Sequence, residues 1–370
     1  MKLLLCAGAL QPQLGGIGRY TWELAQGLPR LPDVERLQCY ARGQLVDEPE
    51  RLLRDGEGGV HRPSTKIGRW WLRRHARRAF AAADLIHAPN YFLPPEVASG
   101  IITIHDLSVF RYPETHPPER LRAFDQEFES SLGRARHVLT STETIRQELM
   151  DAFGLDADQV SAVPLGVDPM FAPRAAKDLE ALSSIGLAPG HYALSVAAFE
   201  PRKRIDLLIA AWRRLNPSLR NRFPLVLVGV PGWRNEGLRE QIDQGVGEGW
   251  LRLLGFVPDE KLPSVYAGAR LFLYPSQYEG FGLPPLEAMA SGVPVLTSPL
   301  SCLPEVCGNA AVYADAAENE GYVEAIERAL TDDPLRDTAI ASGLERAANY
   351  SWARCVEATA AVYRKVIAAH

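Results

Sequence analysis

The chain has 370 residues, of which 46% are apolar and 23% are charged, and its formal net charge is −5. This length exceeds a single typical core and predicts two domains, while the acidic balance argues against general nucleic-acid binding. The five cysteines form no C-x-x-C pair, which argues against a zinc site or a disulfide framework and predicts reduced thiols in the cytoplasm. No apolar stretch approaches the roughly 20 residues of a membrane-spanning helix, so any membrane association would be peripheral.

Strand and helix signals alternate along the first half of the chain, which predicts an α/β domain with a parallel sheet. The apolar runs expected to form buried strands lie within residues 1–8, 84–88, 100–104 and 138–142. A glycine-rich turn at residues 15–18 follows the first run and leads into a helix. Such a turn presents backbone amides to a phosphate, but the dinucleotide fingerprint is incomplete because Thr21 stands where a third glycine would fall.

The most basic part of the chain, residues 69–80, is predicted to form an amphipathic helix. The apolar side is expected to hold Trp71, Leu72, His75, Ala76, Ala79 and Phe80. The other side would offer anionic lipid headgroups a row made of Arg69, Trp70, Arg73, Arg74, Arg77 and Arg78. An ordinary solvated helix face explains the same pattern.

His105 directly follows the strand expected at residues 100–104. Ligands of doubly wound sheets bind beyond the carboxyl ends of the strands, so His105 is placed to reach a ligand. A buried structural histidine is the rival interpretation. Further along, Thr142 is expected to cap a helix over residues 143–149.

The second half restarts the strand and helix alternation after a segment rich in proline, glycine and alanine at residues 164–177, which predicts an interdomain hinge. Its expected strands lie within residues 192–198, 225–229, 250–257, 271–275 and 294–297. Arg202 and Lys203 would neutralise a diphosphate at a strand end, or would form a solvated basic cluster. The D-x-D triplet at residues 156–158 is a possible metal motif, but its place in a polar turn favours a structural role.

Residues 278–290 carry the strongest site signal in the chain. Two glycines allow a tight turn after a buried strand, and the paired prolines that follow suit the first turn of a helix. Glu279 should therefore lie in a loop and Glu287 in the first helical turn, beside an anion-binding helix end. Either carboxylate alone would be explained as a surface or dipole-complementing residue, but the two together indicate a site for a charged, hydroxyl-rich ligand.

Glu279 and Glu287, with seven residues between them, resemble the E-x7-E motif of the retaining glycosyltransferases of family 4, which have the GT-B fold. The resemblance covers nearly the whole chain in the family's order, through residues 15–18, 103–106, 164–168, 201–203, 254–257, 291–295 and 303–306. It implies two Rossmann-like, doubly wound parallel-sheet α/β domains that face a cleft. They are expected at residues 1–170, on the acceptor side, and at residues 171–352, which bind the donor. A C-terminal helix at about residues 353–370 is expected to pack back on the first.

The resemblance also implies residue roles. The enzyme would move a sugar from a nucleotide diphosphate with retention at the anomeric carbon, without a metal or another cofactor. The catalytic residues implied are His105, Arg202, Lys203 and Glu279. The donor contacts implied are Gly16, Phe256, Val257, Gly280, Phe281, Gly282, Leu283 and Glu287. Ala197 stands where the family usually has a glycine, a departure that bears on the local backbone geometry but not on the charge argument. The spacing leaves open whether Glu279 is a nucleophile, and we expect it to orient the sugar.

Residues 103–113 most resemble bacterial mannosyl- and rhamnosyltransferases of polysaccharide assembly. This implies a GDP-activated sugar of the mannose type as co-substrate and a glycan or lipid-linked acceptor of O-antigen-like assembly, at the inner face of the cytoplasmic membrane. A UDP-sugar is the alternative donor. A nucleotide-sugar epimerase, which needs no acceptor, a nicotinamide dehydrogenase and a non-catalytic sugar-binding module are the alternative classes.

Overall fold

The computed structural model describes residues 1–54, 59–60, 65–230, 232 and 236–369, with the backbone alone for residues 66–70, 73 and 236. The chain divides into two compact units. The first consists of Met1–Leu107, Leu121–Gly166 and Trp352–His370, and the second of Ser108–Arg120 and Val167–Ser351. The short segment 108–120, which the sequence placed with the first domain, thus groups with the second.

The first unit is built on a seven-stranded sheet in the order β3-β2-β1-β4-β5-β6-β7. All neighbouring strands are parallel except β2 and β3, which form a hairpin at the edge. The strands are β1 (Lys2–Cys6), β2 (Arg36–Ala41), β3 (Gln44–Val46), β4 (Leu85–Ala88), β5 (Gly100–Ile104), β6 (Ala135–Thr140) and β7 (Val160–Ala162). Because β4 and β5 are covered on both faces, their sequences are apolar runs without polar alternation.

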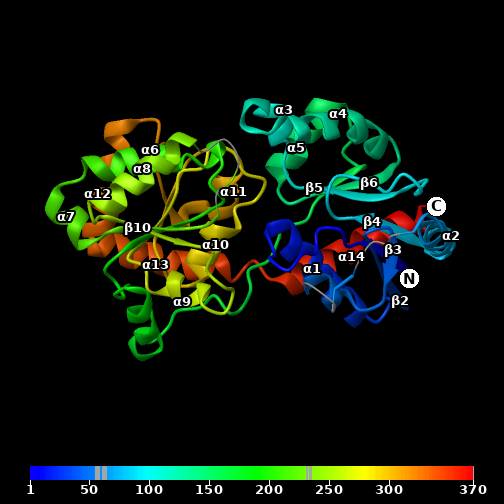
Figure 1. The fold of residues 1–370 in the computed structure, drawn as a ribbon, viewed down its shortest axis with the longest axis horizontal. Coiled ribbons are helices and arrows are strands. Elements are labelled where there is room, and N and C mark those ends of the chain that lie inside the picture. The colour runs from blue at the N-terminus through cyan, green and yellow to red at the C-terminus, as the bar shows by residue number, and fades with distance from the viewer. Residues whose placement is uncertain (55–58, 61–64, 231, 233–235, 370) are drawn as a thin grey trace. The chain divides into compact units, whose positions relative to one another are not determined.

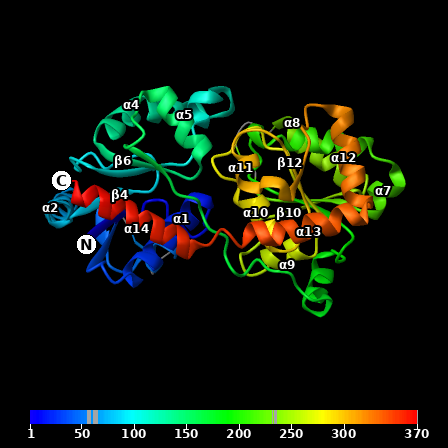
Figure 2. The same ribbon diagram turned by 180° about the vertical axis from the view of Figure 1, so that it is seen from behind.

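Helices cover both faces of this sheet. They are α1 (Gly16–Gly27), α2 (Lys66–Ala82), α4 (Pro118–Gly133), α5 (Glu143–Phe153) and α14 (Trp352–Ala368), with short 3-10 turns at Leu28–Arg30 and Pro49–Leu53. Figures 1 and 2 show α1 and α14 together on one face and α4 and α5 on the other. The predicted cap of α5 is confirmed, because the Thr142 side chain accepts a hydrogen bond from the Ile145 amide. A cap of this kind stabilises a helix by about 1 kcal/mol.

The second unit is built on a six-stranded, entirely parallel sheet in the order β10-β9-β8-β11-β12-β13. Its strands are β8 (Ala193–Val196), β9 (Leu225–Val228), β10 (Leu251–Gly255), β11 (Leu271–Tyr274), β12 (Val295–Thr297) and β13 (Ala311–Tyr313). Two doubly wound parallel sheets confirm the predicted α/β fold class of Rossmann-like domains.

The helices of the second unit also lie on both faces. They are α6 (Ile205–Arg214), α7 (Pro217–Arg222), α8 (Glu236–Gly247), α9 (Leu262–Ala267), α10 (Leu283–Ala290), α11 (Leu303–Cys307), α12 (Asn319–Thr331) and α13 (Asp333–Ala347). The remaining helical pieces are α3 (Ser108–Arg111) and 3-10 turns at Pro113–Thr115, Ala176–Ile185, Pro201–Lys203 and Gly308–Ala310. Figures 1 and 2 show α6, α8 and α12 on one face of the sheet and α9, α10 and α13 on the other.

The predicted burial of the basic helix α2 is partly wrong. Ala76 and Phe80, four residues apart, are buried as expected, but His75 is exposed and Trp71 is 62% exposed. Helical periodicity predicts which residues share a stripe, but it does not predict which turns of that stripe have a partner to pack on. The side chains of Arg69, Trp70 and Arg73 lie outside the described residues. Among the helices that the structure describes, none has the length and apolarity to cross a bilayer.

Candidate active site

The site in the second unit lies where three neighbouring strands of one parallel sheet end. The strands β8, β11 and β12 are adjacent, so their carboxyl ends open onto the same edge. The turn after β8 carries Arg202 and Lys203, and the loop after β11 carries Glu279. A third loop, residues 298–302 after β12, packs against the second. Residues that are 77 positions apart in the chain are thereby brought into direct contact.

Glu279 is the centre of this cluster. Only 6% of the residue is exposed, and its carboxylate is bonded on both oxygens. Oε1 accepts hydrogen bonds from Lys203 Nζ and, at 2.6 Å, from Ser276 Oγ, while Oε2 accepts one from Arg202 Nη1 at 3.3 Å. Burial raises the pKa of Glu279, but Lys203 and Arg202 outweigh it and bring the pKa below its ordinary value. The carboxylate is therefore ionised and firmly held.

The two cations have further partners of their own. Arg202 donates from Nε to Glu200 at 3.0 Å and from Nη1 to the Tyr278 carbonyl at 3.0 Å. Lys203, only 7% exposed, donates to the Tyr274 hydroxyl at 3.1 Å. Burial and the neighbouring Arg202 lower the pKa of Lys203, whereas Glu279 acts in the opposite direction. Because a buried ammonium without a counter-charge is costly, Glu279 keeps Lys203 charged in this position.

The loop after Glu279 makes the predicted tight turn. Gly282 has a φ of 95°, a conformation that side-chain-bearing residues rarely adopt, and α10 begins at the next residue. Gly280 and Phe281 are buried, while Leu283 is partly exposed. Since the two prolines that follow have no amide proton, the backbone donors at this helix start are those of residues 281–283.

Glu287 lies just past the first turn of α10, in which it was predicted to lie. It is the fifth residue of the helix, which places it in the second turn, and it is half-buried. Its carboxylate accepts a hydrogen bond from the Tyr266 hydroxyl of α9 at 2.8 Å. Burial, reinforced by the charge of Glu287, raises the pKa of Tyr266 well above its ordinary value, so the phenol remains a donor.

Phe256 and Val257 follow β10 at the edge of the same sheet. Phe256 is 49% exposed and offers an aromatic surface to solvent, whereas Val257 is buried. Ala197 follows β8, and its φ lies outside the left-handed region, so the alanine at this position is not strained.

The two predicted residues of the first unit also lie beyond carboxyl ends of strands. Gly16 is the first residue of α1, and His105 follows β5. His105 Nε2 must carry a proton, because it bonds at 2.8 Å to the Pro89 carbonyl, which only accepts. Burial lowers the pKa of His105, so the ring is neutral and Nδ1 is an acceptor, 3.4 Å from Ser141 Oγ. The His105 ring is also held edge-on against Tyr20, with the centroids 5.2 Å apart.

Several residues of the site had no signal in the sequence. Tyr274, Ser276, Ser301 and Tyr266 act through hydroxyl groups, and no charge or spacing distinguishes them from the other hydroxyl residues of the chain. Glu200 could have been predicted from the sequence, because it stands two residues before Arg202, with which it forms an ion pair.

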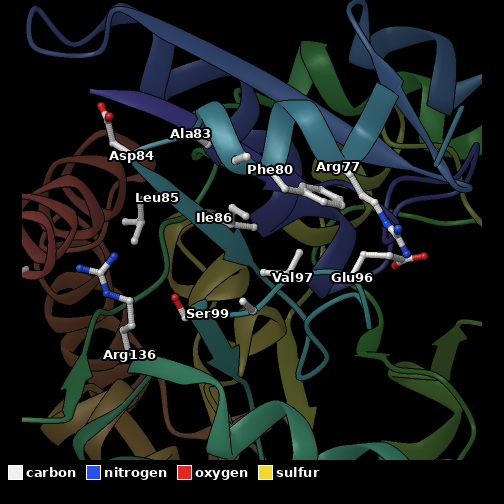
Figure 3. Close-up of a pocket in the computed structure, with 12 residues that line it drawn as sticks. Arg77, Phe80, Ala83, Asp84, Leu85, Ile86, Glu96, Val97, Ser99 and Arg136 are labelled. Carbon is white, nitrogen blue, oxygen red and sulfur yellow. The ribbon is translucent and has the colours of Figure 1, made fainter. Parts of the chain in front are cut away.

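A pocket of about 350 Å³ in the first unit is separate from these residues. In Figure 3, Phe80 and Arg77 of α2 lie at the upper right of the pocket, Asp84 and Leu85 lie at the left, and Ile86 lies between them. These last three lie at the amino end of β4, whereas His105 follows the carboxyl end of the neighbouring parallel strand β5.

Within the described residues, no group of three or more histidine, cysteine or acidic side chains is arranged to hold a metal ion. Residues 156–158 lie at the predicted turn before β7.

Comparison with known proteins identifies the class. Residues 14–171 match the family model described as Glycosyltransferase Family 4, and residues 188–346 match that of Glycosyl transferases group 1. The chain is 36% identical to the O-antigen chain mannosyltransferase B of Escherichia coli, over 98% of this chain and 100% of that protein. It is 34% identical to the serotype-specific mannosyltransferase WbdA of Escherichia coli, over 89% of this chain and 43% of that protein.

Solved structures agree on the fold. Anabaena Alr3699/HepE in complex with UDP and glucose matches with a TM-score of 0.76 at 18% identity, over 99% of this chain and 100% of that one. WaaG, a glycosyltransferase involved in lipopolysaccharide biosynthesis, matches with a TM-score of 0.71 at 16% identity, over 98% and 99% of the two chains. The protein therefore belongs to the family 4 glycosyltransferases and has the GT-B fold, as its sequence predicts.

Proposed function

We propose that this glycosyltransferase moves mannose from GDP-mannose onto a lipid-linked or oligosaccharide acceptor in O-antigen-like assembly, with retention at the anomeric carbon and without a metal. The observation that carries the proposal is the buried cluster of Glu279, Lys203 and Arg202. It lies at the carboxyl ends of parallel strands, where nucleotides bind in doubly wound folds. The likeness to O-antigen mannosyltransferases over the full chain supports the choice of sugar.

Glu279 orients the transferred sugar in this proposal. Its carboxylate already accepts from three donors, so its remaining acceptor capacity suits a single sugar hydroxyl. Pairing with two cations also lowers its nucleophilicity. The acceptor hydroxyl then attacks on the face from which the diphosphate departs, and the departing phosphate takes its proton. Trapping a covalent mannosyl-Glu279 adduct by mass spectrometry would contradict this assignment.

Arg202 and Lys203 stabilise the leaving group. Negative charge grows on the diphosphate as the glycosidic bond breaks, so preorganised cations and amides stabilise the transition state more than the ground state. The backbone amides of residues 281–283 add donors to the same group. Removing one such donor typically costs about 10²–10³ in turnover.

The remaining residues select the donor. Glu287, held by Tyr266, accepts hydrogen bonds from the ribose hydroxyls. The exposed ring of Phe256 and the backbone of Val257 border the base. His105 is neutral, and its Nδ1, 3.4 Å from Ser141 Oγ, is the acceptor that we propose for a hydroxyl of the sugar.

Two assays test this function. A thermal-shift series with GDP, UDP, ADP and dTDP should give the largest rise in melting temperature with GDP, because a ligand that binds only the folded state stabilises it. A larger rise with UDP would support the alternative UDP-sugar donor. Incubation of GDP-mannose without acceptor should leave the donor sugar unchanged on chromatography, whereas an isomerised donor would support an epimerase.

The basic helix α2 is proposed to rest on the inner face of the cytoplasmic membrane. Arg74, Arg77 and Arg78 are exposed, and Trp71 offers an aromatic side chain to the interface. The Arg74→Glu/Arg78→Glu pair should reduce sedimentation with vesicles that contain anionic lipids, while Arg239→Glu on α8 should not. Equal binding of all three proteins would show that α2 is an ordinary solvated helix.

A further inference from the structure

One side chain from another loop contacts the peptide units on both sides of Glu279. Ser301 Oγ donates to the Glu279 carbonyl at 2.7 Å and accepts from the Glu279 amide at 3.3 Å. Cys302 Sγ reaches the same carbonyl at 3.1 Å. The Tyr91 hydroxyl makes the same pair of bonds in the first unit, to the Asp106 carbonyl at 3.1 Å and from the Asp106 amide at 3.2 Å.

This arrangement has a conformational cost. Ser301 has a φ of 57°, in the left-handed region that disfavours residues with a side chain, and it is one of four such non-glycine residues in the described chain. Glycine would adopt the same backbone without strain. Strained residues persist where surrounding contacts over-determine them, and they cluster at functional sites. A serine here therefore points to a use for its hydroxyl.

The Ser301 hydroxyl belongs to a network of hydrogen bonds between the two loops. Ser298 Oγ, from the same loop after β12, donates to the Ser276 carbonyl at 2.6 Å. Ser276 Oγ in turn donates to Glu279 Oε1 at 2.6 Å. The loop after β12 thus fixes the backbone of the loop after β11 at two points, one on each side of Tyr278. Figures 1 and 2 show the helices that follow these loops, α10 and α11, side by side.

We infer that Ser301 is a positioning residue, which sets the direction of the Glu279 carboxylate toward the transferred sugar by fixing both of its peptide planes. Arg202 also holds the Tyr278 carbonyl, in the peptide unit before Glu279, whereas Ser301 and Cys302 hold the Glu279 carbonyl, in the unit after it. A displacement of the reacting groups by about 1 Å is enough to cost roughly 10²-fold in rate. The inference rests on the proposed role of Glu279.

The variant that isolates the hydroxyl is Ser301→Gly, because it removes both hydrogen bonds and relieves the left-handed strain together. Its melting temperature should therefore stay within about 3 °C of wild type. The kcat for transfer from GDP-mannose should fall roughly tenfold to a hundredfold, while the Kd for GDP stays within about twofold. Arg42→Gly is the matched control, since Arg42 has a φ of 53° in the turn between β2 and β3. It should leave kcat unchanged.

Two further readouts separate positioning from a merely structural role. In a Glu279→Gln background, Ser301→Gly should lower kcat by less than about twofold. The reason is that the effects of substituting two residues that act as a unit do not add. Hydrogen exchange of the peptide that contains residues 275–282 should be faster in Ser301→Gly than in wild type, whatever the donor is. Wild-type kcat in Ser301→Gly, or an undiminished effect in the Glu279→Gln background, would overturn the inference. Absence of turnover by wild type with GDP-mannose would instead contradict the proposed donor.

Discussion

The buried ion pair of Glu279 and Lys203 allows a quantitative test by a double-mutant cycle. Replacing Glu279 with glutamine keeps the shape but removes the charge that Lys203 needs. For the more distant partner, Arg202 at 3.3 Å, the gross Coulomb attraction at an effective dielectric of 20 is about 5 kcal/mol. Desolvation offsets much of such an attraction, and breaking a buried pair from one side costs about 3–5 kcal/mol overall.

We therefore expect Glu279→Gln to destabilise the second unit by about 3–5 kcal/mol and to lower its melting temperature by roughly 10 °C. Lys203→Met should be similarly destabilising, because it leaves a buried carboxylate with one cation fewer. The double variant removes both buried charges, while Arg202 still has Glu200 as its partner. Its loss should be smaller than the sum of the two single losses by at least about 2 kcal/mol.

Urea unfolding followed by tryptophan fluorescence is the assay, since Trp212 and Trp250 are both fully buried in the second unit. The cycle needs only the three variants and wild type under one condition. If the loss of unfolding free energy in the double variant equals the sum of the two single losses to within about 0.5 kcal/mol, the two charges do not depend on each other and the expectation is wrong.

Three other predictions concern acid stability, backbone geometry and donor binding. Burial lowers the pKa of His87 to about 3, so the unfolded chain takes up a proton first as the pH falls below about 6.5. The free energy of unfolding of wild type should thus fall by about 2 kcal/mol between pH 7 and 5 because of this residue. In His87→Gln, urea unfolding should show a smaller fall in the free energy of unfolding over the same pH range. In Gly229→Ala the new Cβ would lie 1.8 Å from the Ala197 carbonyl oxygen, so the second unit should melt at least about 10 °C lower, whereas Gly237→Ala, with open space around it, should not. Glu287→Gln should raise the KM for the donor at least about tenfold with little change in kcat, and equal losses in kcat and kcat/KM would assign Glu287 to the transition state instead.

The fold was largely predictable because its strands are buried on both faces. Runs such as residues 225–228 and 271–274 are fully apolar and end at glycine or proline, so their type and order follow from the sequence. The convergence of Arg202, Lys203 and Glu279 was also predictable, since each stands at the end of a predicted parallel strand.

The finer features depend on contacts between loops, which sequence periodicity does not encode. The prolines at 284 and 285 predict a helix start, but α10 begins one residue earlier, which moves Glu287 into the second turn. The bonds of Ser276 and Ser301 depend on where neighbouring loops bring backbone carbonyls. Trp71 was misplaced because an apolar stripe does not show how far along a helix its partner extends.

In the proposed reaction Glu279, paired with two cations, orients a mannosyl group that is transferred from GDP-mannose with retention. The most direct measurement is an NMR time course of GDP-mannose with a mannose-terminated acceptor, which reports both the rate and the anomeric configuration of the product. We expect an α-linked product from wild type, and a rate at least about 10² lower for Glu279→Gln. A β-linked product, or a Glu279→Gln rate equal to that of wild type, would contradict the proposed reaction.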